Sequence, residues 1–127
     1  MRQNFYSGAE WERTVGYSRA VKVGNLIEVS GTTSIIDGNL AYPNDAYAQT
    51  QQIIKIAKAV LEDAGSSLSD VIRTRMYITD ISLWEKVGQA HGEAFKDINP
   101  ASTLVEVSAL IDPEMLVEIE FTAYLSE

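Results

Sequence analysis

The sequence predicts a single α+β domain, in which a mixed β-sheet carries two helices on one of its faces. Segments rich in β-branched and aromatic residues alternate with two segments of helical period, in the order β-β-α-β-α-β-β. A chain of 127 residues can bury one core, and no repeat, linker or low-complexity tract divides it. Residues 1–127 are therefore expected to form one domain.

The first two strands are predicted to form a hairpin. Residues 17–23 and 26–32 are rich in apolar β-formers, and they flank Gly24-Asn25. Both residues of this dipeptide tolerate a positive φ, which two-residue hairpin turns require. Turn-forming residues within 37–44 then predict a loop.

The loop leads into the most regular helical pattern of the chain. Asn44 or Asp45 can cap its N-terminus, and Gly65 stands where a helix commonly ends. The positions expected to face the core follow the 3.6-residue period: Ala46, Thr50, Ile53, Ile54, Ala57, Val60, Leu61 and Ala64.

Residues 70–80 predict a strand whose two faces differ. Alternation places one set on each side of the sheet: Ile72, Met76 and Ile78 on one face, Arg73, Arg75 and Tyr77 on the other. We expect the first set to face the helices.

A second helix is predicted from Trp84, where residues 82–85 match a capping box, to the turn before Pro100. His91 lies on its apolar stripe and is expected to be a hydrogen-bonded buried or interface side chain. Trp84 and Trp11 are expected to pack against other residues.

Two strands complete the domain, at residues 103–108 and 115–125, on either side of a turn at Asp112-Pro113. Two helices can cover only one sheet face, yet the other face carries partly apolar side chains: Tyr17, Tyr77, Thr122 and Tyr124. Such a face indicates burial against another subunit.

Composition excludes several kinds of chemistry. The net charge of −8 disfavours binding of nucleic acid by the surface as a whole. No cysteine and a single histidine leave no thiolate nucleophile and no histidine-based metal cluster. We therefore expect neither metal nor cofactor. Nothing resembles a signal peptide or a membrane span, which together with the absent cysteines favours a cytoplasmic location and no membrane partner.

Four segments carry a family resemblance: GYSRAVKVGNLIEVSGTT, VIRTRMYITD, PASTLVEVSAL and LVEIEFTAY. With the long helix between them, they resemble the RidA/YjgF family over residues 15–125. The family is also labelled endoribonuclease L-PSP or translation inhibitor. The resemblance implies a chorismate-mutase-like fold and a homotrimer whose sheets form a central barrel. It also implies ligand clefts at the three subunit interfaces and cofactor-free deamination of small enamines or imines.

The resemblance also implies site residues. Tyr17 and Ser30 would contact substrate, the backbone of Leu104 would bind it, and Glu118 would orient the attacking water. Ser102 stands where the family has an arginine that binds the substrate carboxylate, and a serine cannot supply that bidentate, charge-assisted contact. Activity on 2-aminoacrylate is therefore expected to be weak.

Other interpretations of these residues stay open. Arg19, two positions after Tyr17, could replace the missing guanidinium or form a surface or intersubunit salt bridge, and Arg75 is a weaker candidate. Glu118 could equally belong to a solvated strand face.

Three functions remain to be separated. The first is a cofactor-free imine or enamine hydrolase, and the second is a homotrimer that binds a small metabolite without catalysis. The third is the ribonuclease or translation-inhibitor role in the family's labels, which the acidic charge and the single histidine disfavour.

Overall fold

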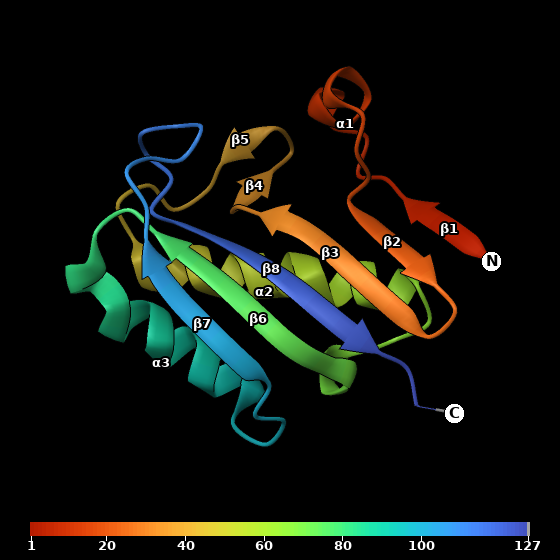
Figure 1. The fold of residues 1–127 in the computed structure, drawn as a ribbon. Helices are drawn as coiled ribbons and strands as arrows, with labels where there is room; N and C mark the ends of the chain where they lie inside the picture. The colour runs from red at the N-terminus through yellow and green to blue at the C-terminus, as the bar shows by residue number, and fades with distance from the viewer. Residues whose placement is uncertain (127) are drawn as a thin grey trace.

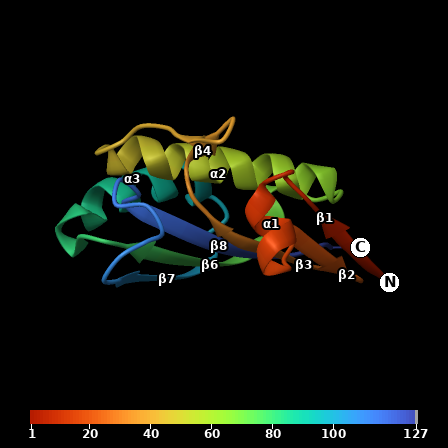
Figure 2. The ribbon, with the colours of Figure 1, turned by 90° about the horizontal axis from the view of Figure 1, so that it is seen from above.

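A computed structural model describes residues 1–126 and shows a six-stranded mixed sheet with two helices on one face (Figures 1 and 2). The strands of the sheet are β1 (Arg2–Phe5), β2 (Ala20–Val23), β3 (Leu26–Thr32), β6 (Val71–Ile78), β7 (Ala101–Glu106) and β8 (Val117–Tyr124). Their order is β1-β2-β3-β8-β6-β7, and only β6 and β7 are parallel. The predicted α+β class is confirmed.

The helix α2 (Ala46–Asp63) confirms the predicted helix in both its ends and its buried face. The Asp45 side chain accepts a hydrogen bond from the backbone N–H of Ala48 at 3.0 Å, which caps the first turn. Gly65 follows the helix with a φ of 83°, a conformation that glycine adopts without steric cost. Figure 2 shows α2 lying over one face of the sheet, and the buried side chains of the core come from both.

The core also contains a polar side chain that the apolar pattern did not indicate. Gln49 of α2 is fully buried, and its amide bonds to the backbone of residues 42, 114 and 116. These bonds attach the loops before α2 and before β8 to the helix, and they satisfy backbone groups that burial would otherwise leave unpaired.

The second helix, α3 (Trp84–Phe95), begins differently from the prediction. The prediction of a capping box at residues 82–85 is wrong. The Asp80 side chain caps the segment instead, accepting a hydrogen bond from the backbone N–H of Ser82 at 3.0 Å. A 3₁₀ turn at Ile81–Leu83 leads directly into α3. Trp84 is 55% exposed and Trp11 is 59% exposed. The expectation that both pack against other residues is therefore not met within a single chain.

The N-terminal sixteen residues hold elements that the sequence pattern did not predict. The edge strand β1 pairs with β2, and the short helix α1 (Glu10–Val15) follows it. The first predicted strand is correspondingly shorter, beginning at Ala20 rather than residue 17. A two-stranded hairpin, β4 (Ile35–Ile36) with β5 (Asn39–Leu40), lies in the predicted loop.

Two irregularities in strand pairing change which way side chains point. The register of β6 against β8 shifts between Val71 and Arg73, and Ile72 is 51% exposed. The expectation that Ile72 faces the core is therefore wrong, because a β-bulge displaces it from the alternation. A second shift, between Val29 and Thr32 of β3, lies at the candidate site.

The sheet face opposite to α2 and α3, which we call the outer face, is only partly polar. Alternation along β8 turns Glu118 and Glu120 to this face, because Val117, Ile119 and Phe121 are buried in the core. Exposed apolar side chains are found on the sheet strands as well, among them Val23, Leu26, Val105 and Tyr124.

Candidate functional site

Glu118 lies half-buried on the outer face, where β8 runs between β3 and β6. Its neighbour in β3 is the bulge that contains Gly31. A Cβ atom on Gly31 would overlap the Oε2 atom of Glu118, so the carboxylate occupies the space that a side chain at residue 31 would need. Glycine at this position is therefore required for the observed placement of the carboxylate.

Arg19 connects this carboxylate to Tyr17. Its Nη2 donates a hydrogen bond of 2.5 Å to the carbonyl oxygen of Gly31, and its guanidinium carbon lies 5.9 Å from the centre of the Tyr17 ring. The Nε atom of Arg19 is buried and has no hydrogen-bond partner among residues 1–126. The structure thus brings Tyr17, Arg19 and Glu118 together around Gly31.

Burial raises the pKa of Glu118 above its usual value of 4.5. The negative charge of Glu120 raises this pKa further, and the positive charge of Arg19 opposes both effects. None of the described residues donates a hydrogen bond to the Glu118 carboxylate. The group therefore combines a partly desolvated charge with free acceptor atoms, a combination typical of a carboxylate that handles a proton or a water.

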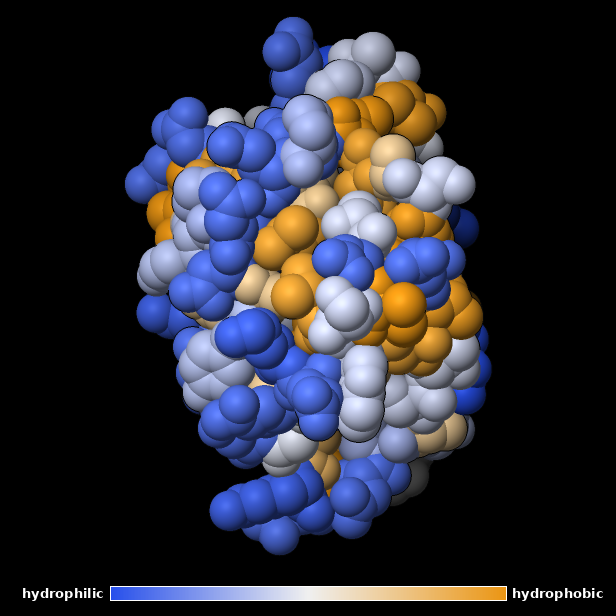
Figure 3. All heavy atoms as spheres, turned by 90° about the vertical axis from the view of Figure 1, so that its left-hand side faces the viewer, coloured by the Kyte–Doolittle hydropathy of each residue, from blue (hydrophilic) through white to orange (hydrophobic). Residues whose placement is uncertain are grey.

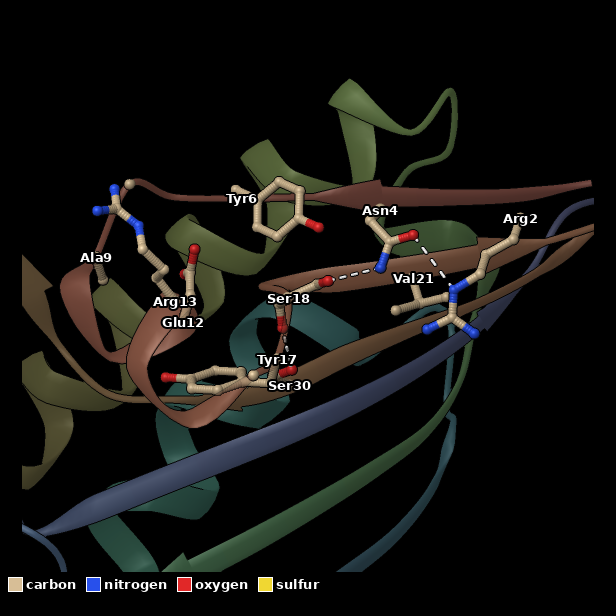
Figure 4. Close-up of a pocket in the computed structure, with 12 residues that line it drawn as sticks. Arg2, Asn4, Tyr6, Ala9, Glu12, Arg13, Tyr17, Ser18, Val21 and Ser30 are labelled. Carbon is tan, nitrogen blue, oxygen red and sulfur yellow. Dashed lines mark hydrogen bonds between the residues drawn. The ribbon is translucent and has the colours of Figure 1, made fainter.

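A cavity of about 730 Å³ opens beside this cluster, between β1, α1 and the start of β2. Tyr17 and Ser30 both line it, as Figure 4 shows, and its remaining walls come from the N-terminal residues. The Ser30 hydroxyl itself is tied to the backbone, donating to Ser18 O at 2.6 Å. Two arginines, Arg2 and Arg13, contribute cationic groups to the walls.

Ser102 and Leu104 lie away from the cavity and from Glu118. Both are in β7, the edge strand beyond β6, where Leu104 packs against the core. The Ser102 hydroxyl accepts a hydrogen bond of 2.8 Å from Thr74, which is fully buried on the helix side of the sheet. Within one chain, therefore, Ser102 and Glu118 lie on opposite faces of the sheet.

Neither arginine of β6 replaces the missing guanidinium beside Ser102. Arg73 donates to the hydroxyl of Thr103 at 2.6 Å, and Arg75 donates to the hydroxyl of Thr122 at 3.4 Å. The alternation of β6 turns both to the outer face, away from Thr74. Arg19 is the arginine whose positive charge acts on the candidate carboxylate.

Residues 1–126 contain no cluster of three or more histidine, aspartate or glutamate side chains arranged to hold a metal ion. None of the helices in this part of the chain is long and apolar enough to cross a membrane.

Comparison with known proteins agrees with the fold and the motifs. The family model described as endoribonuclease L-PSP matches residues 8–125. The chain belongs to this family. It is 47% identical to a Mycobacterium tuberculosis protein of the YjgF/YER057c/UK114 family; the match covers 98% of this chain and 100% of that one, with a TM-score of 0.90.

Two further relatives carry the name RutC. A RutC family protein of Pyrococcus abyssi is 38% identical over 115 residues, which is 85% of each chain. The 3-aminoacrylate deaminase RutC of Acinetobacter baylyi is 32% identical over 110 residues, covering 86% of each chain. The predicted family resemblance is confirmed.

Sequence reasoning missed two parts of the site. The first is Gly31, whose signal was a glycine inside a strand pattern, a known mark of a bulge or a close approach. The second is the N-terminal wall of the cavity, for which the sequence offered no periodic pattern, because β1 and α1 are only four and six residues long.

Proposed function

We propose that this protein forms a homotrimer, binds small ligands in clefts between its subunits, and hydrolyses small imines or enamines without a cofactor. The placement of Glu118 carries the proposal. Its carboxylate is half-buried, its pKa is raised, and it projects over Gly31. Gly31 directly follows Ser30, which lines the cavity together with Tyr17.

The reaction needs one oriented water and one proton carrier. Water adds to the carbon of the C=N bond, the resulting carbinolamine loses ammonia, and a carbonyl remains. A carboxylate with a raised pKa can accept the proton of the attacking water and return it to the departing nitrogen. The positive charge of Arg19 opposes the rise in the pKa of Glu118 and so favours the ionised form that the first step needs.

The candidate residues lie on two different faces of the sheet, which favours ligand clefts between subunits. A ligand that contacts both Ser102 and Glu118 requires that one subunit supplies the first residue and its neighbour the second. The exposed apolar side chains favour such an assembly, because a monomer rarely leaves a broad apolar surface uncovered. Figure 3 shows hydrophobic side chains gathered over one half of the side of the molecule that it draws.

A second candidate function is binding of a metabolite without catalysis. It is favoured by Ser102, which cannot form the bidentate contact that a carboxylate substrate would receive from arginine. The relative named 3-aminoacrylate deaminase supports the hydrolase instead, since its name describes loss of an amino group from an enamine.

Ammonia release separates the two functions. Imines would be generated in the assay from primary amines by an amine oxidase, and 2-aminoacrylate from serine by a dehydratase. We expect wild-type protein to accelerate hydrolysis of the neutral imines, and Glu118→Gln to lose about 10²–10⁴-fold, the usual contribution of a general base. Glu62→Gln, an exposed change on α2, is the matched control. Wild-type rates equal to the uncatalysed rates would contradict the hydrolase and leave the binding function as the proposal.

Mixed oligomers test the location of the cleft. Ser102→Trp fills the cleft with bulk and Glu118→Gln removes the carboxylate, so each variant alone is expected to be inactive. In an oligomer of about 42 kDa, three times 14.0 kDa, that contains both variants, one interface combines two unaltered surfaces. Co-assembled subunits should therefore recover part of the activity. Recovery would not occur if each chain held a complete site.

A further inference from the structure

A chain of hydrogen bonds leads from the helix layer to Ser102. The Nε2 atom of His91 in α3 lies 2.9 Å from the Thr74 hydroxyl, which in turn donates to Ser102 at 2.8 Å. The three residues come from α3, β6 and β7, so packing of three elements fixes their order. His91 also packs against Phe95, with ring centroids 4.7 Å apart. The hydrogen-bonded histidine expected from the sequence is confirmed.

Thr74 makes this series of hydrogen bonds rigid. Its side chain is fully buried, so its hydroxyl needs protein partners, and His91 and Ser102 are those partners. The bond to Thr74 holds the Ser102 hydroxyl in one direction. A serine hydroxyl has one donor and two acceptor positions, and a single inward bond leaves the others directed away from Thr74.

The hydrogen-bonded series His91–Thr74–Ser102 offers a ligand polar groups but no charged group. Burial lowers the pKa of His91, which favours the neutral imidazole. Both arginines of β6 are bonded on the outer face, so neither β6 nor β7 places a cation next to Ser102. Because the Ser102 hydroxyl accepts from Thr74, its own proton stays free to be donated to a ligand, and its remaining lone pair can accept.

We propose that Ser102, positioned by Thr74 and His91, binds an uncharged hydrogen-bonding group of the ligand, such as a primary amide, in place of a carboxylate. The inference rests on the proposed function, because it places Ser102 in the cleft. An amide offers both a donor and an acceptor, which match a hydroxyl that has a free proton and a free lone pair. A carboxylate would lose hydration there without gaining an opposite charge.

Calorimetry with two stable ligands tests this specificity. Pyruvamide and pyruvate differ only in an amide and a carboxylate, and each is the keto product of the corresponding imine. We expect wild-type protein to bind pyruvamide about tenfold more tightly than pyruvate, which corresponds to about 1.4 kcal/mol. Ser102→Ala should remove most of this preference, and Ser102→Arg should reverse it. Ser69→Ala, a serine change on the exposed 3₁₀ turn before β6, should leave it unchanged.

Thr74 variants distinguish positioning from packing. Thr74→Val keeps the shape of the side chain but breaks the chain of bonds, so the amide preference should fall although the protein stays folded. Thr74→Ser restores the hydroxyl and should restore the preference. A wild-type protein that prefers pyruvate, binds neither ligand, or keeps its preference in Ser102→Ala would overturn the proposal. Calorimetry involves no turnover, so failure of the hydrolase proposal would be seen separately, as absent ammonia release by wild-type protein.

Discussion

Two glutamates, one in α1 and one in β8, are both withdrawn from water but in different ways. Glu12 is only 4% exposed, and its carboxylate accepts hydrogen bonds from the backbone N–H and the hydroxyl of Ser7. Its carbonyl oxygen accepts from the N–H groups of Gly16 and Tyr17. Glu118 is less buried, yet it has no donor among the described residues and its pKa is raised.

The difference separates a structural carboxylate from a chemical one. Glu12 has its partners and holds the turn that brings Tyr17 to the cavity, so its removal should unfold the N-terminal wall. Glu118 has free acceptor atoms over Gly31, so its removal should affect chemistry more than folding. The extent of burial alone would have selected Glu12, and not Glu118, as the carboxylate with a chemical role.

The largest effect on stability is expected from Glu12→Ala. Loss of the acceptor leaves the N–H and hydroxyl of Ser7 without their partner, at a cost of about 1.5–3 kcal/mol. Hydrogen exchange should become faster in residues 5–17, and the denaturation midpoint should fall. Glu10→Ala, an exposed change in the same helix, is the control. Equal effects of the two variants would show that the Ser7 bonds do not hold this segment.

An intermediate effect is expected from Gly31→Ala. The added methyl group would displace the Glu118 carboxylate, which can rotate away, so stability should change little while imine hydrolysis falls about tenfold or more. Gly88→Ala is the matched change in α3, where a Cβ meets nothing within 4 Å, and helix propensity should make it stabilising by roughly 0.5–1 kcal/mol. Full activity in Gly31→Ala would show that the position of the carboxylate is unimportant.

The sequence predicted the periodic parts of this molecule well. The hairpin turn at residues 24–25, α2 with its cap at Asp45, and the alternating strand β8 all follow from repeated patterns within single segments. Such patterns are local, and the core enforces them because one face must be buried.

Features that depend on two segments could not be predicted in this way. The bulges at Ile72 and Gly31 arise from register between strands far apart in the sequence, and the Thr74–His91 contact arises from packing of α3 on β6. The individual site residues were proposed by the family resemblance, but the separation of Ser102 from Glu118 required the three-dimensional arrangement. No segment of the sequence indicates which sheet face another segment will share.

The smallest effect is also the one that tests the comparison most directly: Glu118→Gln should stabilise the folded protein at pH 7. The pKa of Glu118 is raised in the folded state, so the folded protein holds this proton more tightly than the unfolded chain does. Ionisation therefore disfavours folding, and this penalty grows as the pH rises above about 4.5, the ordinary value.

Glutamine carries no such penalty, so the Tm of Glu118→Gln should exceed that of the wild type at pH 7 and approach it near pH 4, where Glu118 is mostly protonated. Because the group is half-exposed, screening by water should keep the gain below about 1 kcal/mol. Thermal denaturation of both proteins at the two pH values measures it, with Glu62→Gln as the control. A lower Tm for Glu118→Gln at pH 7 would mean that Glu118, like Glu12, is held by partners, and that its role is structural.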